Sequence, residues 1–272
     1  MAPRWVGLKR LVASVIQSGP IGDAISWFYG DVIPFHGIPI DVSQSGIPAA
    51  NKAALWWGMY ESAEYRFIKA FLFPNLPVIE LGSSIGAISS AIAGQLDHGQ
   101  RLICVEANPF LIPQLRKNLV RNASHLSAEV IHAAVCYEGE SVRFGISANN
   151  LTSSIPGDPG AETTTVPAVT LKALIAQGDR GPYQLVADIE GAEIAFLLHD
   201  AESLRSCQVM VLELHHTQAN GATHTPTDLE HLIERLGFHI TARYGTVVAC
   251  QRLEAGTMVA RSRPQSKTDG LP

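Results

Sequence analysis

The sequence predicts an α/β protein with a doubly wound, mostly parallel sheet. From Pro77 onward, short apolar runs rich in Val, Ile and Leu alternate with segments whose apolar residues recur at helical spacing. The strand-like runs are apolar throughout, so helices are expected to cover both faces of their sheet. Hydrophobic residues make up 46% of the 272 residues and charged residues 17%, which is typical of a compact globular chain.

The first half of this alternation predicts three buried strands that are separated by two helices. Pro109 lies where the second helix opens, a position that suits proline. After the third strand, we expect an edge or hairpin strand and then a loop dense in turn residues. In chain order these elements are strand 77–81, helix 85–96, strand 101–107, helix 109–122, strand 128–135, edge strand 140–146 and loop 148–160.

The second half repeats the alternation and closes with an antiparallel pair. The last helix has Thr or Asp at its start and Gly237 at its end, which are the usual caps. The predicted elements are strand and helix 164–177, strand, turn and helix 183–200, strand 207–216, helix 225–238 and the antiparallel strands 239–245 and 246–253.

The first 70 residues differ from the rest because they contain all four tryptophans. We predict an N-terminal helical extension or cap over residues 1–70, a main domain over 71–253 and a polar tail over 254–272. Residues 1–19 predict a packed amphipathic helix, with a membrane-surface helix as the alternative. Residues 56–72 predict a second helix that presents Tyr60, Glu61 and Glu64 on one face.

Composition excludes some classes of function. The formal net charge is −5 and Lys and Arg form no dense run, which disfavours nucleic-acid binding. The four cysteines are far apart and form no CxxC motif, so free thiols in a reducing, cytoplasmic compartment are expected. No apolar run approaches the roughly 20 residues needed to span a bilayer.

Ligands of such sheets bind at the carboxyl ends of the strands. Strand 77–81 runs into the turn ELGSSIG, in which Gly82 and Gly86 allow a tight turn and the close approach of a ligand. The following helix directs its free N–H groups to the same space. The next strand ends at Glu106, whose carboxylate can accept hydrogen bonds from ribose hydroxyls. This combination predicts a nucleoside site.

The turn favours a methyl donor over a nicotinamide dinucleotide. A dinucleotide fingerprint requires G-x-G-x-x-G, whereas the sequence from Gly82 reads G-S-S-I-G-A and lacks the second and third glycines. The methyl-donor version is an acid followed by G-x-G-x-G. Glu80, Gly82 and Gly86 retain its acid and outer glycines, and Ser84 replaces the middle one.

Two later strands also end in polar side chains. The segment LVADIEGAE places Asp188 at a strand end, followed by Glu190 and Glu193, and VLELHH brings Glu213 and His215 to the same edge. Acidic residues at a helix start also favour the macrodipole, which is a structural alternative for Glu193. A carboxylate and a histidine from adjacent strands can form a general base or a divalent metal site.

The segments VIELGSSIG, CVEANP, LVADIEGAE and VLELH, in this order, resemble the FkbM-type S-adenosylmethionine-dependent methyltransferases. That family typically has an acid-x-Gly-x-Asn-x-Gly turn, a Phe-Glu-Pro strand end and an Ile-Asp-x-Glu-Gly-Ala-Glu segment. The resemblance runs from about Tyr60 to His216, and ADIEGAE is its most specific part. Ser84 stands where asparagine is usual, and Glu80 where aspartate is.

The resemblance implies a class I methyltransferase fold, which is a seven-stranded sheet whose last strand is antiparallel. It also implies O-methylation of a hydroxyl on a sugar, glycan or secondary metabolite. We expect S-adenosylmethionine to contact Glu80, Gly82, Ser84, Gly86, Glu106, Asn108, Ala133 and Ala134. We expect Asp188, His215 and Glu190 in catalysis and Tyr60, Glu61, Glu64, Ser153, Ser154 and Glu193 at the acceptor, with a metal at Asp188, Glu213 and His215 as the less favoured alternative.

Two other functions remain as alternatives at the sequence level. A nicotinamide-dependent oxidoreductase has the same architecture, but the glycine pattern is missing and no Tyr-x-x-x-Lys pair is evident. A non-catalytic binding protein could retain the fold. Its case is weakened because Glu106, Asp188 and Glu190 are all retained.

Overall fold

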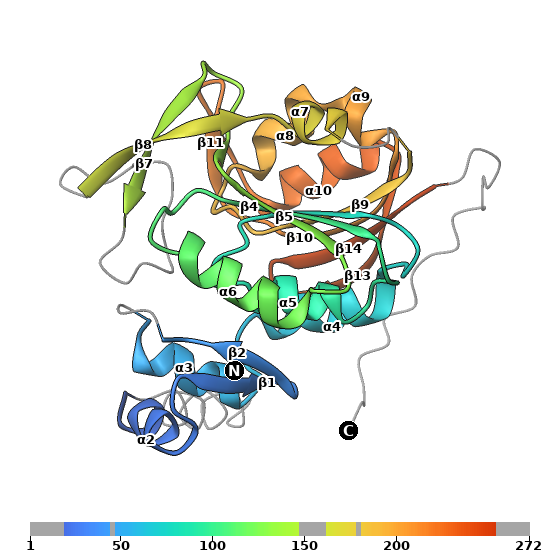
Figure 1. Cartoon of the computed structure of the whole chain (residues 1–272). Coiled ribbons are helices and arrows are strands. Elements are labelled where there is room, and N and C mark those ends of the chain that lie inside the picture. Colours follow the sequence, from blue (N-terminus) through green and yellow to red (C-terminus); the bar gives the residue numbers. More distant parts are fainter. Residues whose placement is uncertain (1–18, 44–46, 147–161, 178–180, 254–272) are drawn as a thin grey trace, which may run out of the picture.

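The computed structural model describes residues 19–43, 47–146, 162–177 and 181–253. Its centre is a seven-stranded sheet in the order β13-β14-β10-β9-β3-β4-β5 (Figure 1). The strands are β3 (Val78–Leu81), β4 (Arg101–Glu106), β5 (Ser127–His132), β9 (Tyr183–Ala187), β10 (Cys207–Glu213), β13 (Phe238–Tyr244) and β14 (Val247–Arg252).

Strand directions confirm the predicted class I sheet. Strand β14 is antiparallel to both of its neighbours, β10 and β13. The pairs formed by β10 with β9, β9 with β3, β3 with β4 and β4 with β5 are parallel. The chain moves outward from β3 in one direction through β4 and β5, and then returns to β9 on the other side. The carboxyl ends of β3, β4 and β9 therefore surround the point where the strand order reverses, where open α/β sheets bind ligands.

Helices cover both faces of the sheet, with α4, α5 and α6 on one side and α7, α8 and α10 on the other (Figure 1). Alternate residues of a strand point to opposite faces, so Val78 joins the first core and Ile79 the second. Helix α10 begins with a capping box between Thr225 and Asp228, as its sequence predicts. The helices are α4 (Ser62–Phe71), α5 (Ala87–Ala93), α6 (Ile112–Asn122), α7 (Leu171–Ala176), α8 (Glu193–His199), α9 (Ala201–Leu204) and α10 (Pro226–Arg235).

Downstream of β3, short strands that do not belong to the main sheet occur at two places in the chain, after β5 and after β10. The predicted strand 128–135 is two strands in the structure, because β5 pairs with β4 whereas β6 pairs with β8. The expected hairpin strand is confirmed by the antiparallel pair β7–β8. A further hairpin, β11–β12, follows β10 and was not expected. Their bounds are β6 (Ala134–Val135), β7 (Ser141–Ile146), β8 (Glu162–Val169), β11 (Thr217–Ala219) and β12 (Ala222–His224).

The N-terminal extension is not wholly helical, which corrects the prediction. Strands β1 and β2 form an antiparallel hairpin whose two turn residues, His36 and Gly37, have φ angles of 48° and 85°. Two positive φ angles are typical of a type I′ turn, but the residue pair lacks the Asn-Gly signal that would reveal it in sequence. The extension contains α2 (Gly19–Tyr29), β1 (Val32–Phe35), β2 (Ile38–Asp41) and α3 (Ala49–Trp56).

The predicted single helix over 56–72 is also wrong. Helix α3 ends at Trp56, α4 begins at Ser62, and the intervening residues include Gly58 and Glu61 with φ angles of 64° and 40°. A Cβ at Gly58 would lie 2.7 Å from the His36 ring, so glycine accommodates the hairpin at this point. Residues with positive φ cannot continue a right-handed helix.

Asp41 joins the extension to α6. Its side chain is 4% exposed, and its Oδ2 lies 2.8 Å from Lys117 Nζ. Its backbone N–H donates to Asn118 Oδ1 at 2.7 Å, and Gln114 Nε2 donates to its carbonyl at 2.6 Å. Burial alone would raise the pKa of Asp41, but hydrogen bonds from Lys117 and Ser43 hold it well below the ordinary value.

Candidate functional site

The turn after β3 fits tightly against the end of β9. Gly82 has a φ angle of 84°, and a Cβ built there would lie 1.8 Å from the carbonyl oxygen of Asp188. The Asp188 N–H donates to the Leu81 carbonyl at 3.0 Å, which continues the pairing of the two strands. Ser84 also has positive φ, 49°. Only glycine therefore fits at position 82. Because it has no side chain, the backbone of Asp188 can lie directly against the turn.

Glu106 is held by backbone donors from both sides. The Ser84 N–H donates to Oε2 and the Asn108 N–H to Oε1, each at 2.7 Å. Burial raises the pKa of Glu106, while these N–H donors oppose the shift. Each carboxylate oxygen can accept more than one hydrogen bond. The oriented carboxylate can thus still receive hydroxyl groups from a ribose.

A cavity opens at this corner and brings together most of the residues predicted to bind the donor. Its lining combines apolar residues with the acidic residues Glu61, Glu106, Asp188 and Glu190. Its lining comprises Glu61, Gly82, Ser84, Val105, Glu106, Ala107, Asn108, Leu111, Ala133, Ala134, Val135, Phe144, Asp188, Ile189, Glu190 and Ala192.

Sequence reasoning missed several of the apolar residues in this lining. Leu111 precedes α6, Phe144 lies in β7 and Ile189 follows Asp188. Nothing in the pattern around Phe144 distinguishes it from an ordinary strand residue. Ile189 could have been found, because it stands inside the ADIEGAE segment that the sequence singles out.

Two residues predicted to contact the donor are not among the lining residues. Glu80 is 1% exposed and accepts a hydrogen bond from the Ser89 hydroxyl. Burial raises its pKa to about 7. Gly86 begins α5 with a φ of 84°, and a Cβ there would lie 2.9 Å from Leu115 Cδ1. Both residues therefore pack against the helices next to the turn and do not line the cavity.

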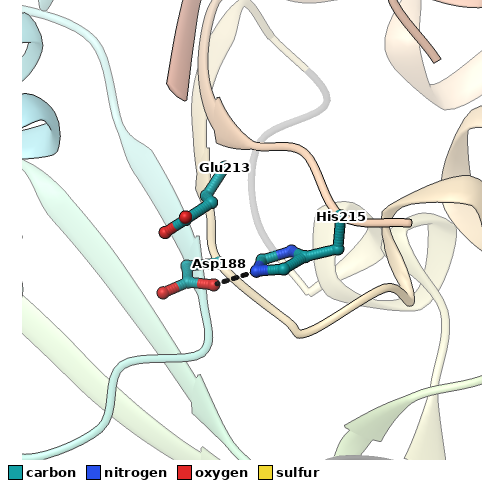
Figure 2. A group of neighbouring side chains, drawn as sticks. All are labelled: Asp188, Glu213 and His215. Carbon is teal, nitrogen blue, oxygen red and sulfur yellow. Dashed lines mark ion pairs between the residues drawn. The ribbon is translucent and has the colours of Figure 1, made fainter. Parts of the chain in front are cut away.

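His215 is oriented by Glu193. Its Nδ1 lies 3.1 Å from Glu193 Oε1, which also accepts the Ile189 N–H at 3.1 Å. The Glu193 side chain is fully buried, at 0% exposure. The prediction placed Glu193 at the acceptor, whereas its carboxylate faces the histidine. With Nδ1 occupied, His215 directs Nε2 towards Asp188 Oδ1 at 3.8 Å (Figure 2). The same nitrogen lies 3.5 Å from Glu190 Oε2.

Burial alone would lower the pKa of His215, but Glu193, Asp188 and Glu190 raise it to about 9. Burial, with Glu213 next in effect, raises the pKa of Asp188 to about 8. Within the described part of the chain, Asp188 Oδ1 is buried and has no hydrogen-bond partner. At neutral pH this group of side chains therefore holds protons that ordinary carboxyl groups would lose.

Asp188, Glu213 and His215 form a compact set, and each offers one possible ligand atom within 4.8 Å of the others (Figure 2). Thr246 Oγ1 donates to Glu213 Oε1 at 2.9 Å and orients it. Glu64, on α4, is buried against Glu213. Burial and this neighbour raise the Glu64 pKa to about 7. The geometry suits either a shared proton or a cation.

The break between α3 and α4 brings the extension into the site. The Tyr60 hydroxyl lies 3.5 Å from Ser84 Oγ, and Glu61 lines the cavity. Burial and the nearby Asp188 carboxylate raise the pKa of Glu61 well above its ordinary value. Ser153 and Ser154, predicted at the acceptor, lie outside the described residues.

Solved structures with a similar fold include several methyltransferases of low sequence identity. One is magnesium protoporphyrin IX methyltransferase from Synechocystis PCC 6803 with bound SAM, at 13% identity and TM-score 0.41, covering 71% of this chain and 77% of that one. Another is precorrin-6y C5,15-methyltransferase from Geobacter metallireducens GS-15, at 11% identity and TM-score 0.42, covering 71% and 88%. A third is the ribosomal protein L11 methylase from Lactobacillus delbrueckii subsp. bulgaricus, at 12% and 0.41, covering 72% and 80%.

No curated protein matches the sequence. None of the described helices is both long and apolar enough to cross a bilayer. The family model of the methyltransferase FkbM domain matches residues 80–240, which is more than half of the 272 residues and includes both the turn 82–86 and His215. The chain therefore belongs to the FkbM family of methyltransferases.

Proposed function

We propose that this methyltransferase transfers a methyl group from S-adenosylmethionine to a hydroxyl group of a sugar, glycan or secondary metabolite. The observation that carries the proposal is the cavity itself. It joins a nucleoside corner, built by Ser84 and Glu106, to Asp188 and Glu190, which face His215.

The residues present fit the methyl donor. Glu106 is oriented by two backbone N–H groups and is placed to receive the ribose hydroxyls. Ala133, Ala134 and Phe144 supply an apolar wall of the kind that an adenine ring requires. When bound, the donor supplies an activated methyl group on a sulfonium.

Asp188 is the proposed base. Methyl transfer forms a bond from the acceptor oxygen to the methyl carbon and breaks the carbon–sulfur bond, so the protein must align three atoms and receive the hydroxyl proton. The ionised form of a carboxyl group whose pKa is near 8 is a stronger base than an ordinary carboxylate, and a growing share of Asp188 takes this form as the pH rises towards 8. His215, fixed by Glu193, lies beside it and favours its anionic form.

Titration with the donor tests this proposal. Calorimetry with S-adenosylmethionine is expected to show binding to the wild type and a loss of affinity of about 10- to 100-fold in Glu106→Gln, which removes a charged acceptor. Glu190→Gln, another carboxylate of the lining, is the matched control and is expected to bind the donor as the wild type does. Binding of NADH but not of S-adenosylmethionine would overturn the proposal, and binding of neither would favour a non-catalytic protein.

A second candidate mechanism uses a divalent metal held by Asp188, Glu213 and His215. It is favoured by their mutual distances within 4.8 Å and by the hydrogen bond that His215 Nδ1 donates to Glu193, which leaves His215 Nε2 available as a ligand. Such an ion would lower the pKa of the acceptor hydroxyl, and no protein base would then be needed.

Metal titration separates the two mechanisms. If a metal is used, calorimetry with Mg²⁺ or Mn²⁺ should show one site in the wild type and at least a tenfold weaker site in Glu213→Gln. Glu234→Gln, an exposed carboxylate on α10, serves as the control. Absence of binding at millimolar metal, together with turnover in EDTA, would leave the protein base as the mechanism.

The place of action is a separate proposal. All four cysteines are free, and three of them are buried. Buried free thiols are typical of proteins that work in a reducing compartment. We therefore propose the cytoplasm. The acceptor itself is best found by a screen of hydroxylated compounds with labelled donor, followed by repetition with Asp188→Asn.

A further inference from the structure

A groove of about 870 Å³ adjoins the cavity on the side of the β11–β12 hairpin. The groove and the cavity share Val135, Ile189, Glu190 and Ala192 among their lining residues. Glu190 carries the carboxyl group that lies 3.5 Å from His215 Nε2. The volume falls within the range of roughly 300–1,000 Å³ that is typical of ligand sites. The groove therefore begins beside the proposed reacting end of the cavity and has room for a second ligand.

One side of the groove is formed by α8 and by the segment that follows β6. On α8, Ile194 and Leu198 are four residues apart and therefore lie on the same face of the helix. Tyr137 and His199 add a pair of stacked rings, whose centroids are 5.1 Å apart and whose planes differ by 24°. The Tyr137 hydroxyl donates to the Asp200 side chain, which fixes the ring. This side offers a ligand a flat and largely apolar surface.

Another side of the groove is formed by the β11–β12 hairpin and is polar. Gln218 and Thr223 are partners in its ladder, so their side chains project from the same face. Both residues are exposed, and both line the groove. Amide and hydroxyl groups donate and accept hydrogen bonds, as the hydroxyls of a polyol do. The turn residues Asn220 and Gly221 have φ angles of 53° and 75°, which are typical of a tight type I′ turn that holds the two strands in register.

Charge restricts what can occupy the groove. The described lining residues of the groove and the cavity together include five acidic residues and no Lys or Arg. The acidic residues are Glu61, Glu106, Glu138, Asp188 and Glu190. An anionic ligand would be repelled by each ionised carboxylate and would find no lysine or arginine partner in this lining. A lining of this kind suits an uncharged ligand that carries several hydroxyl groups.

We propose that this groove binds the methyl acceptor as an uncharged, polyhydroxylated chain and discriminates against anionic acceptors. The inference rests on the proposed function, because it takes the hydroxyl that receives the methyl group to lie at the Glu190 end of the groove. The α8 side contacts the carbon-bound faces of the acceptor, and Gln218 and Thr223 form hydrogen bonds with its hydroxyls. The hairpin that follows β10 thus holds the acceptor, and the acidic lining selects it by charge.

Binding measurements with the full chain test the proposal. An array of uncharged, carboxylated and phosphorylated oligosaccharides is probed in the presence of S-adenosylhomocysteine, the demethylated donor, so that no turnover occurs. We expect uncharged members to bind, and their carboxylated or phosphorylated counterparts to bind at least about tenfold more weakly. Calorimetry with the tightest uncharged member then compares variants. Gln218→Ala/Thr223→Ala should weaken its binding about tenfold, because two hydrogen bonds are lost.

The matched control is Gln177→Ala/Thr227→Ala, which removes an exposed glutamine and an exposed threonine outside the groove and should bind the oligosaccharide as the wild type does. Both double variants should bind S-adenosylmethionine with the wild-type affinity, which shows that they fold. A second readout uses Cys136, which lines the groove and is half-buried, whereas the other three cysteines are buried. The bound oligosaccharide should slow alkylation of Cys136 by iodoacetamide.

Three results would overturn this inference while donor binding is intact. They are the absence of binding to every array member, equal or tighter binding of the anionic members, and wild-type affinity in Gln218→Ala/Thr223→Ala. A wild-type protein that does not bind S-adenosylmethionine would overturn the proposed function, and this inference with it. The donor titration therefore distinguishes the two failures.

Discussion

Asp41 and Glu64 are buried to nearly the same extent, with 3% and 5% of their surfaces exposed, and yet their pKa values shift in opposite directions. Burial raises both. Asp41 receives hydrogen bonds from Lys117 and Ser43, which more than reverse the effect of burial. Glu64 instead faces Glu213, a second carboxylate, and its pKa rises to about 7.

In this protein the partners of a buried carboxyl group, more than its burial, decide whether its pKa falls or rises. Asp41 lies where the extension packs on α6, and its charge is matched by Lys117 and by Arg121 at 3.6 Å. Glu64 and Glu213 belong instead to a group of carboxylates that includes Asp188. Among the charged neighbours that shift the pKa of Asp188, His215 is the cation and the others are carboxylates. Incompletely matched charge is typical of catalytic and ligand sites.

The largest expected effect is on turnover. Asp188→Asn keeps the shape of the side chain and removes its ability to accept a proton. We expect turnover to fall about 10²- to 10⁴-fold, while the donor dissociation constant changes by less than about threefold. Single-turnover assays with labelled donor and calorimetry measure the two quantities. Equal losses in both would assign Asp188 to donor binding and not to proton transfer.

Asp41 is expected to affect stability and not catalysis. Asp41→Asn should lower the free energy of unfolding at pH 7 by about 2 kcal/mol, because Lys117 and Arg121, both partly exposed, lose their buried partner. Denaturant titration measures it. Ser43→Ala, which removes the hydroxyl that donates to Asp41 and accepts from the partly exposed Lys117, should cost about 1 kcal/mol. Since the folded pKa of Asp41 lies below the unfolded one, its contribution is present above about pH 4 and is lost as the pH falls further. A difference between wild type and Asp41→Asn that is independent of pH would contradict this account.

Glu64 should behave in the opposite way, with a smaller effect. Its folded pKa of about 7 lies above the unfolded value of 4.5, so its contribution to stability is present below pH 4.5 and is lost as the pH rises through 7. Glu64→Gln should therefore raise the free energy of unfolding at pH 8 by on the order of 1 kcal/mol, and change it little at pH 4. Glu202→Gln, whose side chain is 82% exposed, should change nothing at either pH. A loss of stability at pH 8 would show that the ionised Glu64 is matched by a cation.

Local patterns were sufficient to predict the sheet and the strand ends that meet at the cavity. The buried strands are continuous apolar runs, and the strand-end rule correctly placed Gly82, Ser84, Glu106 and Asp188 around one cavity. The same reasoning failed for the β1–β2 hairpin and for the break between α3 and α4. Both depend on positive φ angles at His36 and Glu61, which L-residues adopt only when distant packing compensates.

The features that the sequence predicted depend on local interactions along the chain, whereas the features that it missed depend on contacts between distant segments. The sequence by itself determined the order of the seven strands of the main sheet along the chain and the residues at the strand ends, because alternation and glycine turns are local properties. It also identified the family through the ADIEGAE segment. Only the tertiary structure decided that Glu193 is buried behind His215 and that Glu61 enters the cavity from the extension. Those roles depend on contacts between segments distant in the chain, where burial and neighbouring charge set what a carboxylate can do.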